Sequence, residues 1–356
     1  MRKHYLDNLR WCTVLLVLIY HVFYLFNSVG VLGGVGSFSK VQYQDSVLYF
    51  VSPWFMALLF LIAGISSRYA LERRSHKQFI KERTVKLLIP STLGLFVFQW
   101  MVGYFNIKLS GAWDMIPAFI RYPVMAISGI GPLWFIQLLW LFALLLVPIR
   151  KMDSKDKFYT LCGKCNGVAL LLLFLPIWGA SQILNLPVLT VYRFGIYFTV
   201  FLIGYFIFSH DEIQEKIQKI HLPMLMIAVV MGIAYTVYYF GQNYADGACL
   251  KSLFTNAYLW IAILAILGCG KAWFNKTSNF AAYMTKSSFG IYIVHYLVVL
   301  STCYYLKLYT NMPVFAIYLI AIVSVLIISP TLYELLRRIP ILRTLILGIK
   351  KEKIKA

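Results

Sequence analysis

Ten stretches of about 20 apolar residues follow one another along the chain, separated by short polar segments. An α-helix needs about 20 apolar residues to cross the hydrocarbon core of a bilayer. The stretches are continuous, as in VALLLLFLPIWGA (168–180), and do not alternate as barrel strands do. The pattern predicts an all-α polytopic membrane bundle of about ten transmembrane helices, at 9–32, 46–66, 87–106, 132–149, 166–185, 192–208, 222–241, 252–270, 287–306 and 313–333.

Composition agrees with this prediction. Of the 356 residues, 61% are hydrophobic and only 13% are charged, and the mean hydropathy is +0.75. A soluble domain of this length carries about twice that charged fraction. The first apolar stretch lacks a small-residue cleavage site and is expected to stay as the first membrane helix. We expect one integral-membrane domain over 1–356, with a basic cytoplasmic tail at 334–356, in the cytoplasmic membrane.

The basic residues predict the orientation. Net charge is +20, and 27 of the 33 Lys and Arg fall in alternate loops and the two ends if the N-terminus is cytoplasmic. Short cytoplasmic loops retain Lys and Arg, so we expect both termini in the cytoplasm. This topology explains the positive charge without a nucleic-acid partner.

Two histidines interrupt the apolar stretches. His21 stands eleven residues after Arg10, which puts both side chains on one helix face about 16 Å apart. Arg10 would lie at the cytoplasmic entrance and His21 beyond mid-membrane. Ionisable residues at such depth usually face a bundle interior or a water-filled cavity. His295, in the ninth stretch, reaches a similar depth, either as a structural histidine bonded to a carbonyl or as part of a site with His21.

Cations crowd the loop before the third stretch. Topological retention explains part of this density, but Arg83 and Lys86 are three residues apart and share one face at the membrane entrance. Such a pair suits a phosphorylated ligand or a lipid headgroup. Arg68 is a further candidate for the same ligand.

The other polar residues near the outer ends have simpler interpretations. Asp45 suits a helix N-terminus, Trp134 suits the interfacial aromatic belt, and Arg193 is expected to snorkel to the outer surface. Among six cysteines, Cys162 and Cys165 form one CxxC pair, which supplies only two of the four ligands of a structural zinc site. We therefore expect no metal.

Taken in order, these motifs resemble the integral-membrane acyltransferase family 3, which includes cell-envelope O-acyltransferases and enzymes that modify periplasmic glucans. The first helix has Arg-x10-His, here Arg10 and His21. A small-Gly pair follows at Ala63-Gly64, then RTVKLLIP (83–90) with lysine at the second basic position, LWF (133–135) and SFGIYIVH (288–295). Lys86 keeps the charge of the usual arginine but loses its bidentate geometry.

The resemblance implies acyl transfer from cytosolic acyl-CoA to a hydroxyl on an extracytoplasmic glycan or similar acceptor. His21 would be the general base, His295 a second catalytic residue, and Arg10, Arg83, Lys86 and Arg68 the phosphate ligands. The oxyanion donors by position are His295, Tyr292 and Ser288, and Asp45 and Trp134 complete the candidate substrate site. An acyl-histidine intermediate is a less favoured variant.

The competing interpretation is a transporter or flippase for an acylated sugar or lipid-linked glycan. The spans hold no paired carboxylates and no matching pair of broken helices, which such carriers often use. Membrane lipid is an expected partner, and the sequence is compatible with a homo-oligomer. The donor group, acetyl or succinyl, is not decided by any residue.

Overall fold

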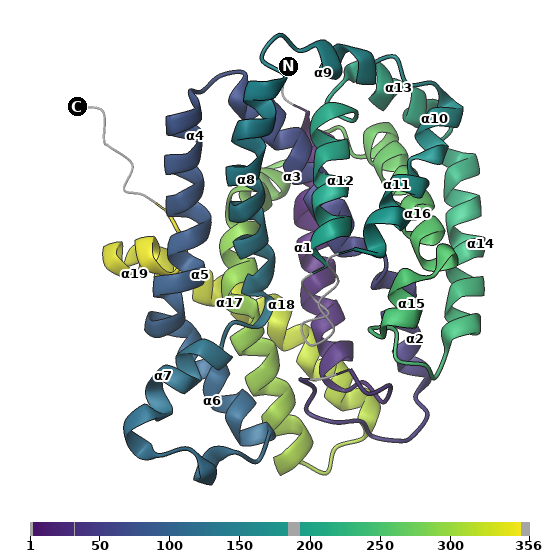
Figure 1. Ribbon diagram of the computed structural model, residues 1–356. Coiled ribbons are helices and arrows are strands. Elements are labelled where there is room, and N and C mark those ends of the chain that lie inside the picture. The colour runs from purple at the N-terminus through teal and green to yellow at the C-terminus, as the bar shows by residue number, and fades with distance from the viewer. Residues whose placement is uncertain (1–2, 32, 184–192, 350–356) are drawn as a thin grey trace.

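The chain folds as a helical bundle, and the computed structural model describes residues 3–31, 33–183 and 193–349 (Figure 1). Over these residues no strand occurs, and eight helical segments are long and apolar enough to cross a membrane. The expected all-α membrane bundle is therefore confirmed. The eight spans are α1 (His4–Leu25), α2 with α3 (Ser46–Val51, Phe55–Leu71), α4 to α6 (His76–Arg83, Ile89–Gly94, Trp100–Leu109), α8 (Trp134–Met152), α14 (His221–Tyr239), α16 (Leu253–Trp273), α17 (Asn279–Tyr309) and α18 (Val314–Arg338).

A ninth span depends on a bent pair of helices. Helix α12 (Phe194–Phe206) is followed after a short break by α13 (Asp211–Lys219), at an angle of 105°. The apolar α12 corresponds to the expected span at 192–208. The polar α13 turns away along the end of the bundle, because its Asp, Glu, Gln and Lys residues suit the membrane surface.

The apolar stretch at 166–185, which was expected to form one membrane span, forms two short helices in the part that the structure describes. Helix α10 (Gly167–Leu172) ends before α11 (Phe174–Ser181) begins. Pro176 has no N–H to offer the Leu172 carbonyl, and its ring crowds that oxygen, so the helical hydrogen-bond pattern is interrupted at Leu173. The 15 residues of 167–181 rise only about 22 Å, less than the hydrocarbon thickness.

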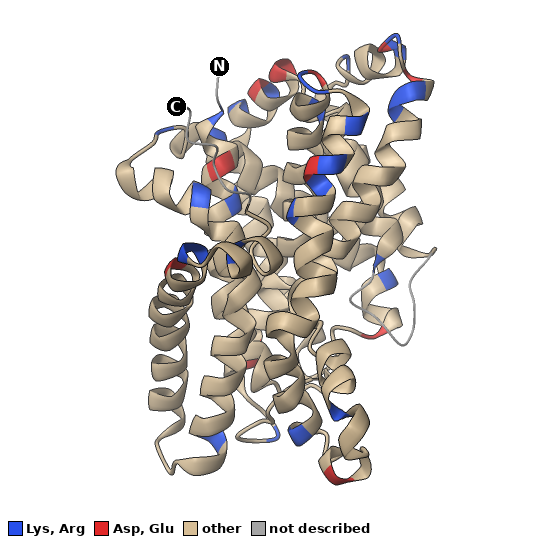
Figure 2. Cartoon of the chain, turned by 90° about the vertical axis from the view of Figure 1, so that its left-hand side faces the viewer, with Lys and Arg blue, Asp and Glu red and all other residues tan. Residues whose placement is uncertain are grey.

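Four further short helices lie near the ends of the bundle or against its flank: α7 (Ala118–Ser128), α9 (Lys157–Cys162), α15 (Gly247–Lys251) and α19 (Pro340–Leu345). Helices α9 and α13 lie at the end where α1 begins, and α6 and α7 lie at the opposite end (Figure 1). Figure 2 shows more Lys and Arg toward the first of these ends. This distribution agrees with the predicted orientation of the chain in the membrane, which stays a prediction. The basic cytoplasmic tail at 334–356 also stays a prediction. Residues 350–356 lie outside the described residues, and α18 extends through the first residues of the tail to Arg338.

Helices α3 and α12 pack backbone to backbone. A Cβ placed on Gly64 would lie 2.0 Å from the Phe201 carbonyl oxygen, and one on Gly204 would lie 2.2 Å from that of Leu61. Only glycine permits this approach. The contact gives a structural reason for the Ala63-Gly64 pair and fixes α3 beside α12.

Helix α1 crosses the centre of the bundle (Figure 1) and packs along α17, with α16 and α18 also against it. Its buried side chains include Val17, Leu18 and Val22. The third span, whose last helix α6 packs against α17, contains two π-helical turns, Thr84–Leu88 and Leu95–Gln99. π-Turns are frequent at functional sites, and the first of them carries Lys86.

Candidate active site

The two membrane histidines meet inside the bundle. Nε2 of His295 on α17 lies 3.2 Å from Nδ1 of His21 on α1, and the ring centroids are 5.0 Å apart. His295 is fully buried and His21 is half-buried. The sequence placed both at similar depth, and the contact between α1 and α17 brings them together.

Backbone carbonyls determine which ring nitrogens carry hydrogen. Nδ1 of His295 lies 2.5 Å from the Tyr292 carbonyl, and Nδ1 of His21 lies 2.8 Å from the Val17 carbonyl. A carbonyl oxygen only accepts, so both Nδ1 atoms donate. In the neutral pair, Nε2 of His295 is then an acceptor, and the single Nδ1–H of His21 is shared between the Val17 carbonyl at 2.8 Å and this nitrogen at 3.2 Å. Nε2 of His21 carries the lone pair that is available to a substrate.

Aromatic rings surround the pair. The Tyr296 ring lies 5.1 Å from that of His21, and the rings of Tyr20 and Tyr24 lie 5.8 and 5.9 Å away. Such surroundings hold the His21 ring in one orientation.

Tyr292 and Ser288, which were the candidate oxyanion donors, are buried on α17. The Tyr292 hydroxyl donates to the Pro132 carbonyl, and its own carbonyl accepts from His295. One turn of α17 is further fixed by Gln99, whose Nε2 donates to the Ile293 carbonyl at 2.9 Å. Tyr292 therefore positions His295 and connects it to the start of α8. Gln99 was missed from the sequence because an amide in an apolar stretch does not indicate its partner.

Three cations gather toward the end of the bundle where α1 begins. Arg10 Nη2 donates to the Ser66 hydroxyl at 3.0 Å, and Arg83 Nη2 lies 3.5 Å from that of Ser67. Lys86 Nζ lies 5.1 Å from the Phe289 ring centroid. Arg10 repels both Arg83 and Lys86 electrostatically, so the three charges share one region.

Little negative charge balances this cluster, which we call the cation cluster (Arg10, Arg83 and Lys86). Arg10 has Asp7 at 3.4 Å, whereas Arg83 and Lys86 form no ion pair with any described residue. Serine hydroxyls as neighbours leave a guanidinium able to bind an anion. The contacts of Ser66 and Ser67 with the two arginines were not predicted, because in the sequence these serines are only small residues that follow Gly64.

Two helices connect the cation cluster to the histidines. On α1, Arg10 and His21 are separated by about 16 Å of helical rise, and on α17 Phe289 and His295 are separated by about 9 Å. A ligand with its phosphates at the cluster would therefore need an extended arm to reach the rings.

Arg68 belongs to a different structure. Its side chain is 6% exposed and pairs with Glu72 at 2.9 Å and Asp156 at 2.7 Å, and its guanidinium lies 3.6 Å from the Tyr159 ring centroid. Burial acts to raise the pKa of Asp156, but the hydrogen bond and charge of Arg68, together with Arg150, outweigh it and lower that pKa. The contacts join α3 to the segment before α9, and the structure does not bring Arg68 into the cation cluster.

Asp45 and Trp134 are also separate from the histidine pair. Asp45 is buried and accepts from the backbone N–H and the hydroxyl of Ser28, at 3.0 and 2.7 Å, which fixes the loop after α1. The Trp134 ring stacks on Tyr197 at 5.5 Å and lies 6.3 Å from Phe60. It therefore packs inside the bundle, not in an outer aromatic belt.

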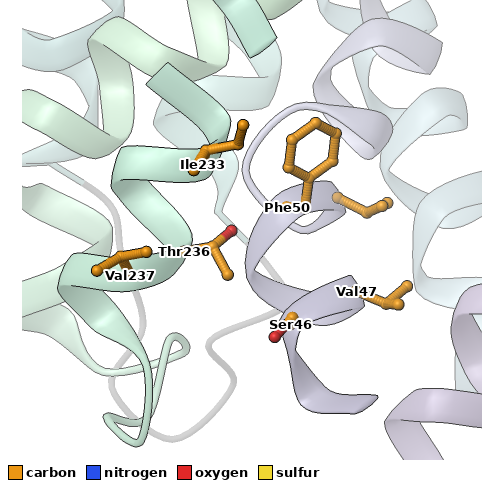
Figure 3. A pocket seen from close by; sticks show the side chains of 7 residues that line it. Ser46, Val47, Phe50, Ile233, Thr236 and Val237 are labelled. Carbon is orange, nitrogen blue, oxygen red and sulfur yellow. The ribbon is translucent and has the colours of Figure 1, made fainter. Parts of the chain in front are cut away.

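Two surface grooves lie away from these residues. One, of about 360 Å³, runs between α2 and α14 (Figure 3) and has an almost wholly apolar lining: Ser46, Val47, Phe50, Val51, Ile233, Thr236 and Val237. The other, of about 840 Å³, lies between α8, α9 and α12 and includes Lys155 and Lys157. Neither lining contains a histidine, so neither groove competes with the histidine pair as a catalytic site.

The fold and this geometry define an integral membrane protein with a general-base candidate inside the bundle and a cation cluster toward the end where α1 begins. The chain belongs to the acyltransferase family 3: the family model described as "Acyltransferase domain" matches residues 3–334. It is therefore a multi-pass membrane acyltransferase.

Curated relatives match over nearly the whole chain. The glucans biosynthesis protein C of Salmonella gallinarum (strain 287/91 / NCTC 13346) is 22% identical over 377 residues, covering 98% of this chain and 95% of the relative. The protein of the same name from Salmonella agona (strain SL483) is 22% identical over 376 residues with the same coverage. No solved structure matches the chain.

Proposed function

We propose that this acyltransferase moves a small acyl group, acetyl or succinyl, from acyl-CoA at the cytoplasmic side of the cytoplasmic membrane to a hydroxyl of an extracytoplasmic glycan. The observation that carries the proposal is the 3.2 Å contact between His295 Nε2 and His21 Nδ1, which leaves Nε2 of His21 as a base. The names of the relatives, which refer to glucans, support a glycan acceptor.

In this mechanism His21 Nε2 takes the proton from the acceptor hydroxyl as its oxygen attacks the thioester carbonyl. The new C–O bond forms, the C–S bond breaks, and the CoA thiolate leaves with the proton that His21 returns. His295 Nε2 and the Val17 carbonyl both accept from the Nδ1–H of His21 and stabilise the imidazolium that forms. His295 is thus a positioning residue for the base.

The cation cluster fits the donor. The phosphates of CoA are anionic, and Arg83 and Lys86 form no ion pair with a described residue, so they would hold the phosphates without first breaking an ion pair. The extended pantetheine arm suits the distances along α1 and α17 from this cluster to the histidines. The cluster would thus fix the donor at the cytoplasmic end.

The test is the release of CoA thiol by the purified protein in detergent or nanodiscs, with acetyl-CoA or succinyl-CoA and a β-glucan acceptor. Acceptor-dependent thiol release with acyl ester on the glycan supports the proposal. An intact thioester, together with movement of glycan across the membrane of proteoliposomes, would instead support a transporter.

A further inference from the structure

Arg193 is a buried cation that the proposed mechanism does not use. It was expected to snorkel to the outer surface, but its residue is only 4% exposed, inside the protein. Its Nε and Nη2 atoms are buried and have no hydrogen-bond partner among the described residues, none of whose carboxylates pairs with it. A buried charge without a counterion is costly, and an anionic ligand at this position would remove that cost.

The position of Arg193 at the start of α12 adds to its attraction for anions. Arg193 is the N-cap residue, and the first turn of this 13-residue helix contains no acidic side chain. Backbone N–H groups and the helix dipole favour negative charge at that end. Two independent features, a buried guanidinium with unpaired N–H groups and a helix N-terminus, therefore point to the same ligand chemistry.

A continuous aromatic path connects Arg193 to the histidines. Its guanidinium carbon lies 5.7 Å from the Tyr197 ring centroid, and Tyr197 stacks on Trp134 at 5.5 Å. Next to Trp134, the Phe135 ring lies 5.6 Å from that of Tyr292, whose carbonyl holds His295. The Tyr197 hydroxyl also interacts electrostatically with Tyr20 and Tyr292, which both border the histidine pair.

We infer that Arg193 determines specificity by binding an anionic group of the substrate, either a carboxylate or a phosphate. The substrate carries this group on the side of the histidine pair opposite the cation cluster. This assignment rests on the proposed function, because it places the anion on a substrate of the acyl transfer. Either the acyl group carries the anion as a terminal carboxylate, or the acceptor carries it. In both cases Arg193 selects an anionic substrate over its neutral analogue.

The first experiment measures whether the site binds anions at all. The melting temperature of the full-length protein in detergent is followed with added succinate or inorganic phosphate, against chloride at the same ionic strength. The variants are Arg193→Met, which removes the charge but keeps the volume, and Lys251→Met as the control, since Lys251 is an exposed cation on α15. Wild type and Lys251→Met should gain about 2 °C with succinate or phosphate, and Arg193→Met should gain none.

The second experiment identifies the source of the anion. Binding of succinyl-CoA, acetyl-CoA and glucose 6-phosphate is compared in wild type and Arg193→Met. If the donor carries the anion, the variant loses about tenfold in affinity for succinyl-CoA and little for acetyl-CoA. If the acceptor carries it, the loss falls on glucose 6-phosphate.

Two results would overturn the inference: the same anion response in Arg193→Met as in wild type, or no response of the wild type to either anion. Failure of the proposed function is a separate result. A protein that binds or consumes no acyl-CoA, yet loses its anion response in Arg193→Met, would refute acyl-CoA as donor and keep the anion site. Fold integrity is read from the melting temperature without anion, which Arg193→Met should not lower, since an apolar side chain replaces an unpaired charge.

Discussion

His295 and His21 form an interhelical contact of 3.2 Å, in which Nε2 of His295 shares the Nδ1–H of His21 with the Val17 carbonyl. Each ring is oriented by a carbonyl of its own helix, and rotation of either helix would break the contact between the two rings. The contact leads to a different prediction for each histidine, because His21 is the proposed base and His295 is the residue that positions it.

The first prediction concerns the base. His21→Ala should lower kcat by about 100-fold or more, because the acceptor hydroxyl loses its proton acceptor. The half-buried position leaves a small cavity, so the variant should still fold, as size-exclusion chromatography and its melting temperature would show. A folded variant with wild-type thiol release would contradict the role of His21.

The second prediction concerns His295. His295→Leu should lower kcat by about 10- to 100-fold while KM for acyl-CoA stays unchanged, because the imidazolium of His21 loses a hydrogen-bond acceptor. In His295→Gln the side-chain oxygen can accept from His21 Nδ1 and should recover part of kcat. Equal losses in the two variants, with equal melting temperatures, would indicate that His295 only fills space.

The third prediction separates the cation cluster from Arg68. Arg83→Ala and Lys86→Ala should each raise KM for acyl-CoA by about tenfold with little change in kcat, because each loses a charged contact to phosphate. Arg68→Ala is the matched control. It should lower the melting temperature, since Asp156 and Glu72 lose their partner, and leave KM within about twofold. An effect of Arg68→Ala on KM as large as that of Arg83→Ala would place Arg68 in the donor site.

The fourth prediction tests the closest helix contact. Gly64→Ala places a Cβ 2.0 Å from the Phe201 carbonyl oxygen, so α3 and α12 must separate and the melting temperature should fall by several degrees. Gly179→Ala is the control, because a Cβ on Gly179 in α11 meets nothing within 4 Å and alanine favours a helix. Its melting temperature should stay equal or rise. A stable Gly64→Ala protein would show that this contact is looser than described.

The helical class and the position of His21 relative to Arg10 could be predicted because both depend on local periodicity. Apolar runs of membrane length specify helices, and eleven residues return to the same face of any helix. The family motifs then identified which polar residues mattered. All these signals lie within one helix or in a fixed order along the chain.

The contacts between side chains of different helices could not be predicted, because they depend on which helices are neighbours. Nothing in α1 indicates that α17 lies beside it, so the His21–His295 contact could only be stated as a condition. The same reason explains Arg68, whose carboxylate partner Asp156 is 88 residues away. Arg193 was misjudged because snorkelling assumes that lipid surrounds the side chain, whereas protein does. The break at 173 depended on one proline in an otherwise regular apolar run.

The two-helix segment α10–α11 has a consequence for the lipid beside it. Leu171, Leu172 and Leu175 are exposed on its outer face, so acyl chains must cover them. Over its described residues this segment rises about 22 Å, against a hydrocarbon layer of about 30 Å, and a bilayer can accommodate such a short segment by thinning. We therefore expect the bilayer to be thinner along this flank than around the rest of the protein, which would shorten the path of a large hydrophilic polymer from the outer solution into the bundle.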